Sequence, residues 1–204
     1  MREYIDLGHM SIVEEKPIGG CYLPHHAVIK SSSVTTKVRV VFDVSAKNDK
    51  RLSLNDTLLV GPTIQDTLVE HLLRFLMYQY VLTADIEKMY QQIWIHPDDR
   101  QYQRIFWWHN KQIRTFELNT VTFGIASAPF LVIQTIKQLA KDEGANYPLK
   151  AEILNRDLYV DDLITGADNI ETFGKRRDQT IKILKQGGLI YDSGRLTSDQ
   201  CSKI

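Results

Sequence analysis

The chain has 204 residues, 43% of them hydrophobic, and its 25 basic residues balance 25 acidic ones. This is enough for one domain with a buried core, or for one domain and a small lobe. No run approaches the roughly 18 apolar residues of a membrane span, and two distant cysteines exclude a disulfide framework. The neutral balance lacks a global basic signature, which weakens a nucleic-acid-binding role without refuting it.

The N-terminal part of the chain is expected to begin without regular structure. Residues 1–20 carry no apolar signal segment, and Gly19-Gly20 closes a loop. Two strands follow at 27–29 and 38–42, the second with alternating side chains. Residues 47–56 are polar and rich in turn-forming types. The absent signal and the few cysteines favour a reducing, intracellular compartment.

The middle of the chain is expected to alternate helix and strand. Thr63 opens a predicted helix, whose apolar residues recur at helical spacing: Ile64, Leu68, Leu72, Phe75 and Leu76. An apolar strand follows at 81–86. Segments 101–108 and 112–118 flank His109-Asn110-Lys111, which predicts a β-hairpin.

Two further helices are predicted in the last part of the chain. Ser127 precedes a long one, with Pro129 in the first turn, where proline is tolerated. Asp168 and Glu171 resemble a capping box that starts the second, and Gly187-Gly188 ends it. Helices with antiparallel strands predict an α+β fold.

Two adjacent carboxylates, Asp161 and Asp162, stand between the apolar runs 158–160 and 163–164. The pattern predicts two short buried strands joined by a hairpin with the aspartates at its tip. Like charges this close resist ionisation unless a cation lies between them. A polar hairpin turn that contains two acids explains the pair alone equally well.

A second apolar strand ends on another carboxylate, Asp85. Side by side in a sheet, the two elements would bring Asp85 against Asp161 and Asp162. Carboxylate oxygens on rigid elements suit Mg²⁺, and such a set holds two Mg²⁺ ions roughly 3.5–4 Å apart in polymerases and nucleases. Three ordinary turn acids are the alternative.

Six stretches, in this order, resemble the reverse transcriptase domain of long-terminal-repeat retrotransposons, and most closely the Pao/BEL group. They are 22–28, 37–43, Ser53-Leu54-Asn55-Asp56, 84–90, 122–129 and Tyr159-Val160-Asp161-Asp162. Each is weak alone, whereas six in family order are specific. Together they span most of the chain, from about residue 4 to residue 189.

The resemblance implies a polymerase palm, an antiparallel sheet with packed helices, plus partial fingers and no thumb. Residues 1–84 would form an N-terminal extension and a fingers-like part. Residues 85–204 would form the palm-like part, with a second fingers-like portion around 97–118. The whole would be one continuous reverse transcriptase fold, truncated at its C-terminus.

The resemblance also implies roles for residues near the acids. Asp85, Asp161 and Asp162 would be the catalytic metal ligands, and Ile86 would add a backbone carbonyl. The cofactor would be two Mg²⁺ ions, with Mn²⁺ as an alternative. Tyr159 would brace the primer end, although a packed strand tyrosine explains it nearly as well.

A nucleotide pocket is implied by five further residues. Lys37 and Arg39 share a strand face and would contact the incoming triphosphate, Arg39 through two hydrogen bonds at once. Tyr90 would crowd the sugar 2′ position, and Phe123 and Gly124 would line the sugar and base. A solvated basic strand and a core tyrosine are the alternative interpretations of Lys37, Arg39 and Tyr90.

The C-terminal segment departs from the family pattern. Where a Lys-Trp pair and Ser-Asn are expected, residues 189–195 read Leu-Ile-Tyr-Asp-Ser-Gly-Arg, and Arg195 holds its proton too tightly to act as an acid. Asp192-Ser193-Gly194 resembles the triplet of aspartic proteases, but too few residues follow it for that fold. The pair His25-His26 lacks cysteine partners at zinc spacing.

The resemblance implies an RNA- and DNA-directed DNA polymerase domain of a retrotransposon Pol polyprotein. Its partners would be an RNA or DNA template with primer, deoxynucleoside triphosphates, and the polyprotein's protease, ribonuclease H and integrase, with no membrane. Its place would be the cytoplasm, virus-like particles included. The alternatives are a non-catalytic relic or domesticated fragment kept as an interaction module, and a two-metal phosphodiesterase, against which Tyr90 and Phe123 argue.

Overall fold

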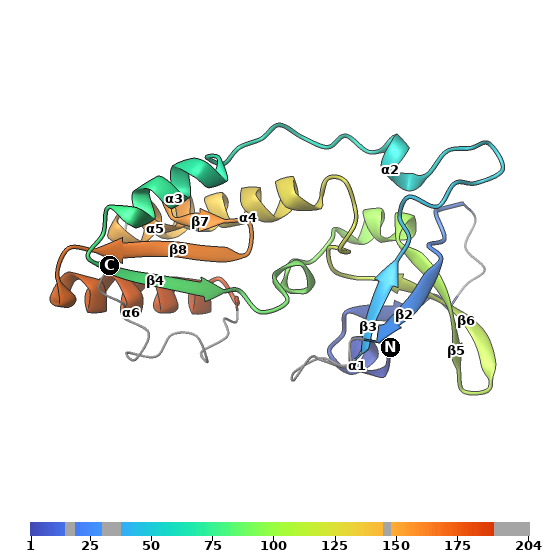
Figure 1. Cartoon of the computed structure of the whole chain (residues 1–204). Coiled ribbons are helices and arrows are strands. Elements are labelled where there is room, and N and C mark those ends of the chain that lie inside the picture. Colours follow the sequence, from blue (N-terminus) through green and yellow to red (C-terminus); the bar gives the residue numbers. More distant parts are fainter. Residues whose placement is uncertain (15–18, 30–37, 145–147, 190–204) are drawn as a thin grey trace. The chain divides into compact units, whose positions relative to one another are not determined.

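The chain forms two compact units in the computed structural model, which describes residues 1–14, 19–29, 38–144 and 148–189 (Figure 1). Unit one comprises Met1–Val60 and Ile93–Ala128, and unit two comprises Gly61–Gln92 and Pro129–Ile204. These boundaries do not coincide with residue 84, because the strand that ends on Asp85 lies wholly within unit two. Lys37 and residues 190–195 lie outside the described part of the chain.

Unit one contains a three-stranded sheet in the order β1-β6-β5 and a two-stranded sheet of β2 and β3. Its elements are α1 (Arg2–Asp6), β1 (Met10–Ile12), β2 (His25–Ile29), β3 (Val38–Phe42), α2 (Leu54–Thr57), the 3-10 helix η2 (Pro97–Tyr102), β5 (Arg104–His109) and β6 (Gln112–Leu118). Asn110 and Lys111 turn the β5–β6 hairpin with positive φ at both positions, as a type I′ turn requires. The predicted hairpin and the strands at 27–29 and 38–42 are confirmed.

The expectation that residues 1–20 are irregular is wrong for two segments, α1 and β1. β1 pairs antiparallel with β6, with Met10 opposite Leu118. The amide of Asn119 holds this segment, donating to the Gly8 carbonyl at 2.8 Å and accepting from the Ser11 hydroxyl at 3.0 Å. A three-residue strand whose partner lies over a hundred residues away leaves no local periodicity to detect.

Unit two is built on an antiparallel sheet in the order β4-β8-β7. Its elements are α3 (Leu68–Leu76), β4 (Tyr80–Asp85), the 3-10 helix η1 (Met89–Gln92), α4 (Ala128–Gly144, whose first residue belongs to unit one), α5 (Pro148–Arg156), β7 (Leu158–Tyr159), β8 (Asp162–Ala167) and α6 (Ile170–Gln186). The long helix begins directly after Ser127, as predicted, whereas α5 was not predicted. Every pairing between the strands named above is antiparallel, so the α+β prediction is confirmed.

Two predicted helix starts are wrong. α3 begins at Leu68 rather than at Thr63, because Thr67 and Glu70 form a reciprocal capping box four residues later. α6 is capped by Asn169, whose side chain accepts from the Thr172 N–H at 2.8 Å, and not by Asp168. Neighbouring polar residues compete for the cap, so the sequence alone did not identify the correct one. The end of α6 at Gly187 is as predicted.

The two faces of the β4–β8 sheet are covered by different helices. Alternation along β4 directs Leu82 and Ala84 to one face and Asp85 to the other. α6 covers the first face, where the rings of Tyr80 and Phe173 lie 6.4 Å apart. α3 contacts β8, and His71 is its one buried residue. Leu68, Leu72 and Leu76, which recur at helical spacing and were predicted to face the core, are exposed. Within the described residues, no helix has the length and apolar character needed to cross a membrane.

Candidate active site

Three carboxylate residues lie at one end of the unit two sheet. Asp85 is the last residue of β4 and stands directly opposite Asp162, the first residue of β8. Asp161 belongs to the turn before β8, and its carbonyl accepts a hydrogen bond from the Ile86 N–H at 2.9 Å. The predicted hairpin is therefore present, with Val160 and Asp161 at its tip and Asp162 already in the strand. Buried neighbours on both strands, Ala84 and Leu163, anchor this end in the core.

The turn that carries Asp161 has an unusual backbone. Val160 has φ 55°, and Asp161 does not share the positive φ, which is the pattern of a type II′ hairpin turn. Glycine is favoured at that first position, and a β-branched residue there costs about 1–3 kcal/mol. The Gln65 side-chain oxygen accepts from the Val160 N–H at 3.2 Å and so holds the turn from outside the sheet.

Tyr159 lies on the same sheet face as the acids. It stands opposite Asp162 in the β7–β8 register, and directly opposed residues project to one face. Its ring meets the buried His71 ring of α3 edge-on, at 5.5 Å between centroids. The acid-bearing face therefore continues into an aromatic contact beneath α3.

Tyr90 lies close enough to Asp161 to respond to its charge. It belongs to the short helix η1, which follows the turn after β4, and its side chain is half-buried. Burial raises the pKa of the Tyr90 phenol, and the negative charge of Asp161 raises it further. Of the five residues assigned to the nucleotide pocket, Tyr90 is the one placed in unit two with the acids.

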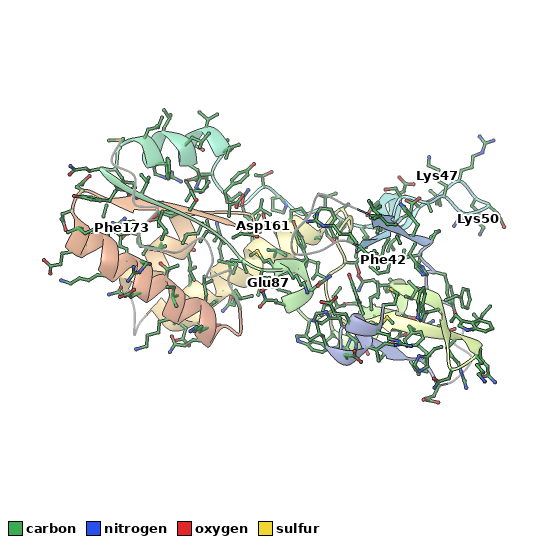
Figure 2. The ribbon with its side chains drawn as sticks, turned by 60° about the horizontal axis from the view of Figure 1, so that its bottom comes forward. Phe42, Lys47, Lys50, Glu87, Asp161 and Phe173 are labelled. Atoms are coloured by element: carbon green, nitrogen blue, oxygen red, sulfur yellow. The ribbon has the colours of Figure 1, made fainter. Side chains whose placement is uncertain are left out.

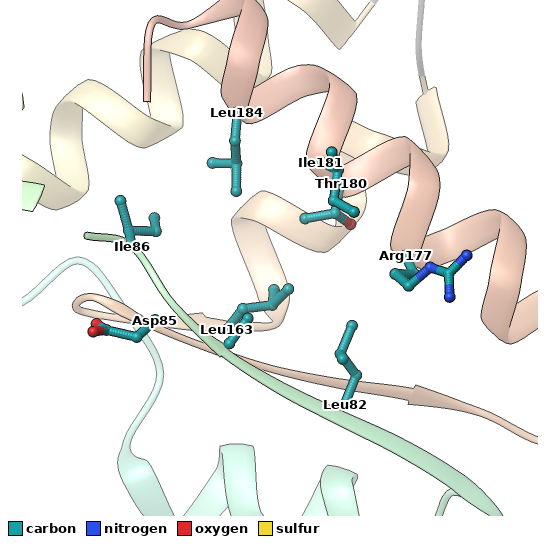
Figure 3. A pocket seen from close by; sticks show the side chains of 9 residues that line it. Leu82, Asp85, Ile86, Leu163, Arg177, Thr180, Ile181 and Leu184 are labelled. Carbon is teal, nitrogen blue, oxygen red and sulfur yellow. The ribbon is translucent and has the colours of Figure 1, made fainter. Parts of the chain in front are cut away.

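The acids stand at the margin of an apolar pocket in unit two. β4, β8 and α6 line it with Leu82, Ala84, Asp85, Ile86, Leu163, Arg177, Thr180, Ile181 and Leu184. Figure 3 shows Leu82 and Leu163 directed toward α6, while the Asp85 carboxylate points away from them. In Figure 2, Asp161 and Glu87 lie at one end of the sheet, and Phe173 lies toward the other. This pocket belongs to the palm-side core that supports the acids from behind.

The three acids offer the kind of oxygen donors that suit a hard divalent cation. No group of three or more His, Cys, Asp or Glu side chains in the described ranges is arranged to hold a metal ion. The backbone nevertheless brings Asp85 and Asp162 into direct opposition and ties Asp161 to Ile86. Carboxylate oxygens on such a frame have the chemistry that Mg²⁺ prefers.

The other predicted pocket residues that the structure describes, Arg39, Phe123 and Gly124, belong to unit one. Arg39 is exposed on β3, opposite Val28. Phe123 has 75% of its surface exposed, and Gly124 adopts φ 98°, which favours glycine. His25 lies among the Phe42 and Trp107 rings and His26 is exposed, as expected for histidines outside a zinc site.

Sequence reasoning missed three residues that support these positions. Gln65 fixes the turn at Val160, His71 contacts Tyr159, and Asn55 bonds the loop after Phe123. Gln65 and His71 leave no local signal, because each acts on a residue far along the chain. Asn55 stands in one of the six family-like stretches, but its partner was not evident from spacing.

Comparisons with known proteins agree with this geometry. Residues 31–193 match the family described as "Reverse transcriptase (RNA-dependent DNA polymerase)". The comparison with curated proteins gave no match. The native prototype foamy virus protease-reverse transcriptase superposes with a TM-score of 0.67 and 18% identity, over 93% of this chain and 22% of that chain. A foamy viral protease-reverse transcriptase in complex with double-stranded DNA gives a TM-score of 0.70 and 17% identity, over 93% and 28%.

The chain thus spans less than a third of the length of these solved chains. At such identities the likeness concerns the fold, and it supports the predicted palm and fingers. The family match shows more than the fold, because it covers most of the sequence and includes all three acids as well as Arg39, Tyr90, Phe123 and Gly124. The chain belongs to the reverse transcriptase family, the RNA-dependent DNA polymerases.

Proposed function

We propose that this chain is the polymerase part of an active RNA- and DNA-directed DNA polymerase, which joins deoxynucleotides to a primer 3′-hydroxyl. One observation carries the proposal: Asp85 stands opposite Asp162 while Asp161 is tied by its carbonyl to Ile86. Two core strands thus deliver three acids to one end of a sheet. Packing of the sheet does not explain that coincidence, because like charges this close repel one another.

The acids are proposed to hold two Mg²⁺ ions, with Asp85 and Asp161 as principal ligands and Asp162 and the Ile86 carbonyl beside them. When bound, such ions activate the primer hydroxyl and stabilise the charge of the triphosphate and leaving pyrophosphate. The protein's own contribution is to bring three carboxylate residues to one end of the sheet through strand pairing. Mn²⁺ takes similar oxygen ligands and is expected to substitute.

The remaining assigned residues are proposed to bind and orient the substrates. Tyr90, half-buried and near Asp161, would stand as a wall against the sugar 2′ position. Phe123 and Gly124 would line the sugar and base, because an exposed ring next to a glycine leaves room for a ligand on the backbone. Lys37 and Arg39 would contact the triphosphate, and Tyr159 would brace the primer.

The origin proposed for the chain is a retrotransposon of the Pao/BEL group, on the six stretches that resemble that group. The rest of a Pol polyprotein, with protease, ribonuclease H and integrase, would then be its partners, together with template and primer. The foamy viral relatives are protease-reverse transcriptases, and one is bound to double-stranded DNA. These properties of the relatives support the proposal.

A second candidate is a non-catalytic descendant that keeps the fold as an interaction module. One observation favours it: residues 189–195 depart from the family pattern. Both candidates predict the same fold, so only a test of chemistry separates them.

The test is primer extension by a longer version of the protein that continues beyond Ile204, given primer–template, Mg²⁺ and deoxynucleotides. Asp161→Asn should lower the extension rate by about a thousandfold, several kcal/mol of transition-state stabilisation, while primer–template affinity stays nearly unchanged. Asp168→Asn is the matched control, because Asp168 is exposed beyond the other end of β8. Undiminished extension by Asp161→Asn would contradict the metal assignment, and an inactive parent protein would favour the relic.

A further inference from the structure

We infer that Asn55 is a positioning residue: its amide clamps the loop after Phe123 and thereby sets the affinity for the incoming nucleotide. The inference rests on the proposed function, because it takes Phe123 and Gly124 as part of the nucleotide pocket. Asn55 and the loop both belong to unit one. Nothing in the family-like stretch around Asn55 predicted this contact.

The Asn55 amide makes three hydrogen bonds, two of them with the loop. Its nitrogen donates to the Gly124 carbonyl at 3.0 Å and to the Ser45 hydroxyl oxygen at 3.0 Å. Its oxygen accepts from the Ala126 N–H at 2.8 Å. Only one orientation of the amide satisfies the loop, because the flipped one would set oxygen against oxygen and N–H against N–H. The side chain thus bonds two loop backbone groups as a neighbouring strand would.

The short helix α2 holds Asn55 firmly. The Ser53 hydroxyl accepts from the Asp56 N–H, and the Asp56 carboxylate accepts from the Ser53 N–H at 2.9 Å and hydroxyl at 2.8 Å. The backbone hydrogen bond from Ser53, and then its hydroxyl, lower the pKa of Asp56. Ser53 and Leu54 are buried, so the helix is anchored to the unit on one side. The clamp therefore has a rigid base, which a side chain on a free loop would lack.

The clamped loop is the one that needs support. Gly124 has φ 98°, and Phe123 before it is 75% exposed, so the core does not cover the Phe123 side chain. Buried Thr122 and Ile125 anchor the loop on either side of these two residues, and the Thr122 carbonyl accepts from the Ile125 N–H at 3.3 Å. Losing the amide would leave the Gly124 carbonyl and the Ala126 N–H without these bonds. The freed loop would then have to be ordered when a nucleotide binds. This cost weakens the affinity for the nucleotide and leaves the metal acids unchanged.

The clamp itself is tested by amide hydrogen exchange on the present chain. Asn55→Ala should speed exchange of the Ala126 N–H about tenfold or more, since one hydrogen bond contributes about that factor. Asn55→Asp keeps the side-chain oxygen but turns a second oxygen toward Gly124, so Ala126 should stay largely protected. Asn48→Ala is the matched control, because Asn48 accepts from the N–H groups of Lys50 and Leu52 and not from this loop. Unchanged exchange at Ala126 in Asn55→Ala would overturn the clamp.

The effect on substrate is tested with the longer, extension-competent protein. Both Asn55 variants should raise the KM for a deoxynucleoside triphosphate about tenfold, because each loses one or two of the hydrogen bonds that order the loop. The kcat and the affinity for primer–template should change less than about threefold, because the acids are untouched. A general folding defect would instead lower kcat through a smaller active fraction. Asn48→Ala should leave all three quantities unchanged.

The outcomes separate the inference from the proposed function. Faster Ala126 exchange with a raised KM supports the inference, whereas faster exchange with an unchanged KM overturns the positioning role. A parent protein that extends no primer and binds no Mg²⁺–deoxynucleotide overturns the proposed function and the nucleotide part of the inference. Faster exchange in Asn55→Ala would even then support the clamp as a property of unit one.

Discussion

In unit two the candidate carboxylates are placed by backbone pairing, whereas in unit one the candidate nucleotide residues lie on an exposed strand and in a loop. Asp85 ends β4 and Asp162 begins β8, and the buried residues next to them on the two strands fix the register. Phe123 and Gly124 have no such frame, and the Asn55 amide supplies the bonds that a sheet would otherwise give. The metal acids are thus placed by strand pairing, and the nucleotide loop is held in part by one side chain.

The two units also differ in what a buried charged side chain holds in place. In unit one, Arg104 is buried and donates to Glu117 at 2.8 Å and to the Gly19 carbonyl at 2.9 Å, which secures an N-terminal segment. In unit two, Asp157 is buried beside β8 and accepts from the Thr165 hydroxyl at 2.6 Å. The first contact joins a loop to a sheet, and the second joins the bend between α5 and β7 to β8, in the sheet that carries the acids. Changes at Asp157 should therefore affect the candidate site most.

The largest effect is expected for Asp157→Ala. It leaves the buried Thr165 hydroxyl without its acceptor and removes one of the two carboxylate partners of Arg156, which keeps Glu152. The free energy of unfolding should therefore fall by about 2–4 kcal/mol. Hydrogen exchange should show lost protection in β4 and β8 while β5 and β6 stay protected.

Asp178→Ala is the matched control, because Asp178 is 65% exposed and pairs with Arg177 on the surface. It should change stability by less than about 0.5 kcal/mol. Equal loss of protection in both units after Asp157→Ala would break the comparison, since it would make the two units a single folding unit.

The elements that placed the acids could be predicted from the sequence, and those that support them could not. Apolar runs ending on Asp85 and around Asp161 predicted β4 and the β7–β8 hairpin, because alternation and turn chemistry are local. The start of α3 was misplaced because two threonines, Thr63 and Thr67, both suit a cap. The burial of His71 with exposure of its neighbouring leucines reverses what apolar spacing predicts, since tertiary contacts decide which helix face is covered.

Contacts that join distant segments were also beyond prediction. β1 pairs with β6, and Gln65 reaches Val160, with no periodicity linking the partners. Of the candidate site, the three acids were identified from pattern and resemblance, and their backbone proximity followed from strand order. The Asn55 clamp was not identified, because a hydrogen bond from a side chain to a loop depends on geometry that neither composition nor spacing encodes.

A smaller effect, of opposite sign, is expected for Val160→Gly. Relief of the positive φ gains about 1–3 kcal/mol, and the greater freedom of glycine in the unfolded chain offsets about 0.5–1 kcal/mol of it. We therefore expect the free energy of unfolding of unit two to rise by about 1 kcal/mol, measured as a higher denaturant midpoint.

Activity should move the other way from stability in this variant. If the strained turn directs the Asp161 carboxylate, primer extension by the longer protein should slow in Val160→Gly even though the fold is more stable. A destabilised variant would instead show that packing of the Val160 side chain outweighs the strain. An equally active and more stable variant would show that core pairing alone positions the acids, which sharpens the contrast with the Asn55-held loop.

The smallest expected effect is a pH dependence confined to unit two. His71 is buried, and its Nδ1 faces Arg74 Nη2 at 3.3 Å, which requires a neutral ring with the proton on Nε2. Burial lowers the pKa of His71, and the charge of Arg74 lowers it further, against the opposing charges of Asp66, Asp157 and Glu70. Below a pH of about 6.5, the ordinary pKa of histidine, His71 binds a proton in the unfolded chain but not in the folded chain. Stability should therefore fall as the pH drops from 7 toward 5.

The histidine responsible can be assigned by substitution. His71→Phe keeps an aromatic ring against Tyr159 but cannot be protonated, so the slope of stability against pH between 5 and 7 should flatten. His26→Phe is the matched control, because His26 is exposed on β2 of unit one. Denaturant midpoints at several pH values, read from probes in each unit, provide the measurement. An unchanged slope in His71→Phe would contradict a neutral His71, and an equal slope in unit one would show that acid sensitivity does not distinguish the two units.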